Sequence, residues 1–181
     1  MNSLNLPNSI TVLRLILVIP TTIFLIKDKY TLAVILFFVA AISDIADGFF
    51  ARILNQKTKI GAILDPLADK FLINYTFLIL STKGLIPLLL FGVVLFKDII
   101  LISGSVVGVL TSKNCKFNIK ASIWGKISTF LQVVVIVEVF FKIFNTYFNK
   151  TIFDITVYVC ILLSVAALID YTNKYLKREE L

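Results

Sequence analysis

The sequence predicts an all-α integral membrane protein, a bundle of six transmembrane helices with its active site at the cytoplasmic face. Of the 181 residues, 59% are hydrophobic, and the mean hydropathy is +0.96, whereas soluble domains are roughly 45–50% apolar. The apolar residues fall into six segments, each close to the ~20 residues with which a helix crosses the hydrocarbon core of a bilayer. The expected spans are Ser9 to Ile26, Thr31 to Leu54, Ala62 to Ser81, Leu85 to Leu110, Trp124 to Phe148 and Ile152 to Tyr171.

The first expected span is predicted to be a retained helix rather than a cleaved signal peptide. A signal peptide has a basic region before its apolar core and a small-residue cleavage site after it, whereas residues 1–8 carry no charged side chain. The connections between the later spans are short and contain no Gly/Ser-rich linker, low-complexity tract or internal repeat. A single domain, residues 1–181, is therefore expected.

The basic residues predict the orientation of the bundle. Six spans place both termini on one side, and the loops on that side carry more Lys and Arg, so this side is predicted to face the cytoplasm across the cell (inner) membrane. The net charge of +7 is spread over loops beside the membrane, which suits anionic lipid or a phosphorylated substrate, so no nucleic-acid partner is expected. The cytoplasmic set is Arg52, Lys57, Lys59, Lys113, Lys116, Lys120, Lys126, Lys174, Lys177 and Arg178, against Lys27, Lys29, Lys83, Lys142 and Lys150 on the other side.

The second and third spans carry four aspartates at their cytoplasmic ends. Asp44 and Asp47 are three residues apart, and Asp65 and Asp69 are four apart, so each pair lies on one face of its helix. Acidic groups deep in a span cost roughly 2.5 to 3.5 kcal/mol each, and divalent cations would offset both this cost and their mutual repulsion. All-oxygen ligation favours Mg²⁺, Mn²⁺ or Ca²⁺ over zinc, and four aspartates suit two such cations.

Together these residues resemble the signature of the CDP-alcohol phosphatidyltransferase family at every fixed position. The pattern is Asp44-x-x-Asp47-Gly48-x-x-Ala51-Arg52, then eight residues, then Gly61-x-x-x-Asp65-x-x-x-Asp69. The segments LPNSITVLR and WGKISTFLQ resemble the family's P-N-x-x-T-x-x-R and G-K-x-x-T-x-x-Q stretches. The resemblance implies two divalent cations, Mg²⁺ or Mn²⁺, on the four aspartates, with Asp69 also acting as the catalytic base. It further implies a homodimer and binding of CDP-diacylglycerol by Asn8, Thr11, Gly48, Ala51, Arg52 and Gly61.

The resemblance leaves the acceptor alcohol open. The N-terminal segment and the Gly125-Lys126 stretch resemble bacterial members that use glycerol 3-phosphate, the preferred prediction, and Arg14, Lys97 and Lys126 are the candidate ligands of its phosphate. The fourth span, with Lys97-Asp98 and no later arginine, also resembles members that use phosphatidylglycerol. Structural alternatives are an Arg14 that snorkels to the headgroups and an internal Lys97–Asp98 ion pair.

A cation transporter is the alternative from a different functional class, because acidic groups within spans also mark ion pathways. The clustering of the charges at one membrane face, without an inverted repeat, favours an enzyme.

Overall fold

The computed structural model describes residues 6–53, 61–111, 123–145 and 147–179. In these ranges it contains six helices and no strand, which confirms the predicted all-α class and the order of the six elements. The helices are α1 (Leu6–Ile26), α2 (Tyr30–Ile53), α3 (Gly61–Thr82), α4 (Leu88–Thr111), α5 (Ile123–Ile143) and α6 (Lys150–Glu179).

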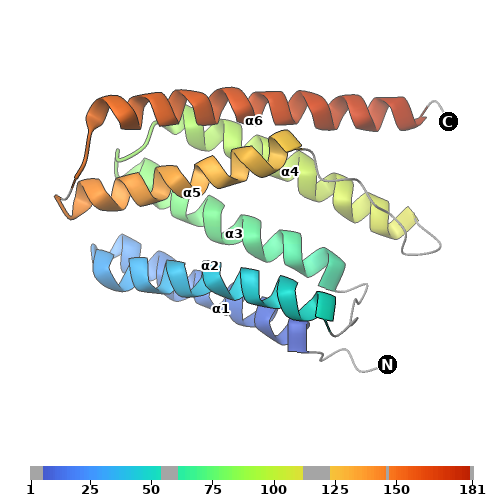
Figure 1. Cartoon of the computed structure of the whole chain (residues 1–181), viewed down its shortest axis with the longest axis horizontal. Helices are drawn as coiled ribbons and strands as arrows, with labels where there is room; N and C mark the ends of the chain where they lie inside the picture. Colours follow the sequence, from blue (N-terminus) through green and yellow to red (C-terminus); the bar gives the residue numbers. More distant parts are fainter. Residues whose placement is uncertain (1–5, 54–60, 112–122, 146, 180–181) are drawn as a thin grey trace. The chain divides into compact units, whose positions relative to one another are not determined.

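The chain divides into two compact units. The first comprises residues 1–80 and 105–117 and contains α1, α2 and most of α3, while the second comprises residues 81–104 and 118–181 and contains most of α4 together with α5 and α6. Within the first unit α1 packs along α2, and within the second α5 packs along α6 (Figure 1). The expected single domain stays a prediction, and each unit is described by itself.

Three of the turns between consecutive helices contain a residue with a positive φ angle. Asp28 (φ 57°) follows α1, Gly84 (φ 68°) follows α3 and Asn145 (φ 56°) follows α5. Glycine has no Cβ to clash in this conformation, and Asn and Asp tolerate it better than other residues do. Each of these helices ends two residues before its positive-φ residue.

At two of the helix ends that differ from the expected spans, local backbone chemistry overrides the apolar pattern. The fourth helix begins at Leu88 rather than Leu85, since Pro87 precedes it and its carbonyl accepts the Leu90 N–H at 3.1 Å. The fifth ends at Ile143 rather than Phe148. The next helix is then capped by the Asn149 side chain, whose Oδ1 accepts the Thr151 N–H at 2.9 Å.

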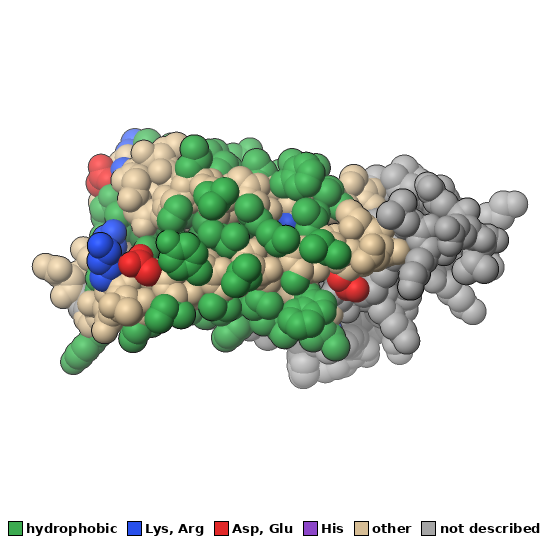
Figure 2. All heavy atoms as spheres, turned by 90° about the horizontal axis from the view of Figure 1, so that it is seen from above, with side chains coloured by type: hydrophobic (Ala, Val, Ile, Leu, Met, Phe, Trp, Pro, Cys, Tyr) green, Lys and Arg blue, Asp and Glu red, His purple; other side chains and the backbone are tan. Residues whose placement is uncertain are grey.

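Many large hydrophobic side chains of the described helices are exposed, while several charged and polar ones are buried. Ile19 on α1 is 63% exposed and Leu162 on α6 is 69% exposed, whereas Arg14 and Lys97 are each 1% exposed. Figure 2 shows hydrophobic side chains spread over the face in view. A soluble domain has the opposite arrangement, and this one suits a hydrocarbon environment.

One stretch of the described residues is long and apolar enough to cross a membrane by itself, Lys150–Asn173 of α6, with a mean hydropathy of 2.5. Two shorter apolar stretches are Thr11–Ile26 in α1 and Tyr30–Ser43 in α2. The number of helices thus agrees with the six expected spans, and α6 meets the criterion for a span.

Candidate active site

The four predicted aspartates lie toward the adjoining ends of two consecutive helices. Asp44 and Asp47 lie in the last three turns of α2, and Asp65 and Asp69 lie in the first three turns of α3. Only residues 54–60 connect the two helices, and both aspartate-bearing segments belong to the first compact unit. With a rise of ~1.5 Å per residue, every one of the four is within about 14 Å of this connection along its helix axis. The fold therefore places both pairs toward the same end of α2 and α3.

The donor set of these aspartates fits Mg²⁺ or Mn²⁺. Carboxylate oxygens are the ligands that hard divalent cations prefer, and the chain contains no histidine. Asp69 is partly exposed, while the side chains of Asp44, Asp47 and Asp65 lie outside the described residues. Among the side chains that are described, no group of three potential ligands forms. The assignment of a two-cation site therefore depends on the spacing and backbone placement of the four residues.

The residues expected to bind the donor nucleotide lie on α1 and on the two helices that carry the aspartates, α2 and α3. In the last turns of α2 lie Gly48, Ala51 and Arg52, while Gly61 is the first residue of α3 and Asn8 lies on α1. The side chains of these five residues lie outside the described part of the structure.

On α1 the described side chains include two polar groups that are fully covered by protein. Thr11 is 0% exposed and Arg14 is 1% exposed, and their spacing of three residues puts them on one helical face. At this exposure the Arg14 side chain is covered by protein and does not extend to the surface as a snorkelling side chain would. Lys70, next to Asp69 on α3, is also buried at 6% exposure.

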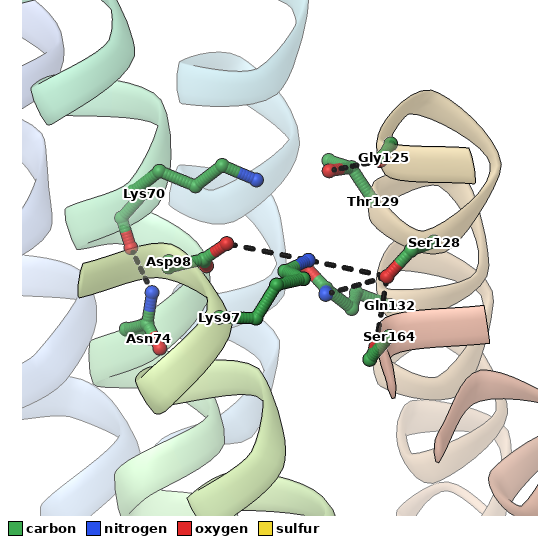
Figure 3. A network of polar contacts seen from close by, with 9 residues as sticks. All are labelled: Lys70, Asn74, Lys97, Asp98, Gly125, Ser128, Thr129, Gln132 and Ser164. Carbon is green, nitrogen blue, oxygen red and sulfur yellow. Dashed lines mark hydrogen bonds and ion pairs between the residues drawn. The ribbon is translucent and has the colours of Figure 1, made fainter. Parts of the chain in front are cut away.

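A buried polar cluster connects α4, α5 and α6 in the second unit, and we call it the Ser128 cluster (Figure 3). Lys97 Nζ lies 3.2 Å from Asp98 Oδ1 and donates to Ser128 Oγ at 3.1 Å. Gln132 Nε2 donates to the same Oγ at 3.3 Å, and the Ser164 hydroxyl lies 2.8 Å from it. All five side chains are at most 1% exposed.

The lone pairs and the proton of the Ser128 hydroxyl indicate the direction of its hydrogen bond with Ser164. A hydroxyl oxygen has two lone pairs and one proton. Lys97 and Gln132 both donate to Ser128, so its lone pairs are used and its proton is left to donate to Ser164. Ser128 is therefore the residue through which the Lys97 ammonium group on α4 is connected to α6.

The predicted phosphate ligands Lys97 and Lys126 occupy different environments. Lys97 forms the internal ion pair with Asp98 that was the structural alternative, whereas Lys126 is exposed on the first turns of α5.

Gly125, which precedes Lys126 on α5, is buried against Tyr171 of α6. A Cβ at Gly125 would overlap the Tyr171 hydroxyl and lie 3.1 Å from Cζ. A side chain at Gly125 would therefore require the end of the Tyr171 side chain to move.

Sequence reasoning missed Ser128 and Ser164 because uncharged small residues are ordinary in membrane helices. One signal was present: Ser128 and Gln132 are four residues apart, on the same helical face, within the WGKISTFLQ segment.

Comparison with known proteins gives a family match over most of the chain. The profile of the CDP-alcohol phosphatidyltransferase family matches residues 4–170. The CDP-diacylglycerol--glycerol-3-phosphate 3-phosphatidyltransferase of Aquifex aeolicus is 36% identical over 180 residues, covering 96% of this chain and 97% of that protein. The enzyme of the same name from Bacillus subtilis is 27% identical over 188 residues, covering 94% of each.

A second group of relatives is similar over a shorter region. Human cardiolipin synthase (CMP-forming) is 34% identical over 103 residues, which covers 56% of this chain and 34% of that protein. The similarity to the Aquifex aeolicus and Bacillus subtilis enzymes thus extends over nearly the whole chain, whereas the similarity to human cardiolipin synthase covers about half of it.

Proposed function

Because the chain belongs to the CDP-alcohol phosphatidyltransferase family, we propose that it transfers the phosphatidyl group of CDP-diacylglycerol to glycerol 3-phosphate, giving phosphatidylglycerophosphate and CMP. The observation that carries the proposal is similarity over almost the full length to enzymes named for this reaction, together with the complete aspartate pattern. Phospholipid biosynthesis is the process that this reaction serves.

Asp44, Asp47, Asp65 and Asp69 are the residues that would hold two divalent cations, Mg²⁺ or Mn²⁺. Bound cations neutralise the charge that develops on the attacking and leaving oxygens during phosphoryl transfer. The carboxylates supply oxygen ligands from two helices of one unit. They also require such cations, because four acids grouped in an apolar bundle otherwise repel one another.

Asp69 is assigned as the base that takes the proton of the acceptor hydroxyl. The hydroxyl oxygen forms a bond to the lipid-side phosphorus, the bond from this phosphorus to the bridging oxygen breaks, and CMP leaves with that oxygen. Asp69 has the partial exposure that contact with a water-soluble acceptor requires. Asn8, Thr11, Gly48, Ala51, Arg52 and Gly61 are assigned to the donor, since the helix ends that carry the aspartates also carry most of them.

The phosphate of the acceptor is assigned to Arg14 and Lys126. The guanidinium group of Arg14 suits a phosphate with two parallel hydrogen bonds, and the exposed ammonium group of Lys126 is accessible from water. Lys97 is retained as a third candidate, but its bonds to Asp98 and Ser128 support a positioning role.

We place all six helices across the cell (inner) membrane with both termini and the site at the cytoplasmic face. The exposed apolar side chains of α1 and α6 and the distribution of basic residues support this placement. A homodimer is likewise proposed, from the resemblance to the family alone, and light scattering in detergent would test it.

Purified protein in detergent should be given labelled CDP-diacylglycerol with glycerol 3-phosphate, phosphatidylglycerol, inositol phosphate or serine in parallel. We expect CMP release and a phosphatidylglycerophosphate product with glycerol 3-phosphate. Cardiolipin formed from phosphatidylglycerol would instead identify the chain as a cardiolipin synthase, the alternative that the human relative supports. A cation transporter would release no CMP with any acceptor and would need a sealed bilayer to show activity.

A further inference from the structure

An apolar groove lies between α1 and α3 in the first unit, and we call it the α1–α3 groove. It encloses about 340 Å³. One wall is a stripe of α1 that extends from Leu15 to Ile23, and the other consists of Phe71 and Tyr75 of α3. The one hydroxyl in the α1 wall, that of Thr22, donates to the Val18 carbonyl at 2.8 Å, so the wall as a whole is apolar.

Each wall of the groove is preceded along its helix by a buried cation. Arg14, at 1% exposure, comes immediately before Leu15, and Lys70, at 6% exposure, comes immediately before Phe71. Because α1 and α3 are separated by the antiparallel α2, they run in the same direction, so both cations lie at the same end of the groove. Asp69, the proposed base, precedes Lys70 and therefore lies at this end as well.

An apolar groove with cations at one end is complementary to an anionic lipid with its headgroup at that end. Along the α1 wall, the distance from Leu15 to Ile23 is about 12 Å at ~1.5 Å per residue, which corresponds to a substantial part of an extended acyl chain. The walls remain partly exposed, with Phe71 at 38% and Ile23 at 43%, so a chain can enter from the side.

We propose that the α1–α3 groove binds one acyl chain of the CDP-diacylglycerol donor, with the lipid headgroup at the end of the groove where Asp69 and Lys70 lie. This inference rests on the proposed function, which supplies the lipid. Its chain then anchors the donor in a fixed register, so that the lipid-side phosphorus is held at the depth of Asp69. The groove would thereby recognise the length of the chain as well as its apolar character.

The test is a substitution that fills the end of the groove far from the cations. Ile23→Trp should shorten the groove and leave the residues at its cationic end unchanged. In mixed micelles we expect the KM for a donor with oleoyl chains to rise about tenfold, the effect of excluding roughly two methylenes from the groove, while the KM for a donor with hexanoyl chains, which are too short to reach Ile23, changes less than about twofold. The KM for glycerol 3-phosphate should not change.

The matched control is Ile16→Trp, which adds the same side chain at an exposed position of α1 (56%) that does not line the groove. It should affect both donors equally.

If Ile23→Trp also affects both donors equally, or affects neither, the inference is wrong. The turnover of the wild-type protein would still support the proposed function. If Ile23→Trp changes the mass of the purified protein without changing the dependence on chain length, the groove is an interface with a second copy and the inference is likewise wrong. A wild-type protein that releases no CMP refutes the proposed function first.

Discussion

The aspartates of α2 and α3 and the Ser128 cluster of α4 to α6 are two ways of placing charge inside an apolar helix bundle. In the first, four groups of the same sign lie toward one end of two helices, and no equal number of basic residues accompanies them in the same segments. In the second, Lys97 and Asp98 form an ion pair at 3.2 Å, and Lys97 also donates a hydrogen bond to Ser128.

The difference lies in what each group requires from outside the chain. The aspartates need an external cation to remain ionised side by side, so their state depends on the solution. The Ser128 cluster is neutral overall and inaccessible to solvent, so its state depends on helix packing. The comparison therefore separates a region that reacts from a region that positions, and each of the following predictions probes one side of it.

Removal of divalent cations should have the largest effect. We expect excess EDTA to abolish CMP release and added Mg²⁺ or Mn²⁺ to restore it, because the four carboxylates need cations to act together. The helix content by circular dichroism should not change, since the Ser128 cluster contains no cation site. Full turnover in EDTA would show that the aspartates do not act through metal.

Asp69→Asn should lower the rate of CMP release by roughly 10²- to 10⁴-fold, the usual contribution of a general base. Asparagine keeps the shape of the side chain but cannot take the proton of the acceptor. The measurement is turnover at saturating donor and acceptor, with thermal unfolding as the check on folding. A rate near that of the wild type would remove Asp69 from the mechanism.

Lys97→Met should destabilise the protein by about 3 to 5 kcal/mol, because it removes the buried cation that offsets the charge of Asp98. The double variant Lys97→Met with Asp98→Leu should recover most of this loss, since both charges are removed together. Thermal unfolding in detergent measures both, and Lys27→Met, at an exposed lysine, is the control. Equal stability of the single and double variants would show that the pair does not act as a unit.

Lys126→Gln should have the smallest effect, a rise of about tenfold in the KM for glycerol 3-phosphate with little change in the KM for CDP-diacylglycerol. The exposed ammonium group is proposed to contact the acceptor phosphate and takes no part in the Ser128 cluster. Lys142→Gln changes an exposed lysine of the same helix and should alter neither value. Equal changes in both KM values for Lys126→Gln would contradict its assignment to the acceptor.

Much of the fold could be predicted because helices that cross a bilayer are specified by long apolar segments. The starts of α2 and α3 each lie within one residue of the predicted span. The predicted ends at Leu85 and Phe148 were wrong because Pro87 and Asn145 act through backbone conformation, which hydropathy does not report.

The candidate site shows the same division between pattern and packing. The spacing of Asp44, Asp47, Asp65 and Asp69 places two pairs on helical faces, and this needs only the periodicity of a helix. The pairing of Ser128 with Ser164 depends on how α5 and α6 are rotated against each other, which no short segment of sequence encodes. For Lys97, likewise, both alternatives were consistent with the sequence; the packing shows the ion pair with Asp98, and the phosphate-binding role stays a prediction.

The contact between Gly125 and Tyr171 makes the order of amino-acid changes at this point of the α5–α6 interface matter. Any side chain at Gly125 meets the Tyr171 hydroxyl first and the ring behind it second. Tyr171 can lose its hydroxyl while Gly125 stays as it is, but Gly125 cannot acquire a methyl group while Tyr171 keeps its position. A lineage that changes the tyrosine first therefore meets no clash, whereas one that changes the glycine first must also move the tyrosine ring.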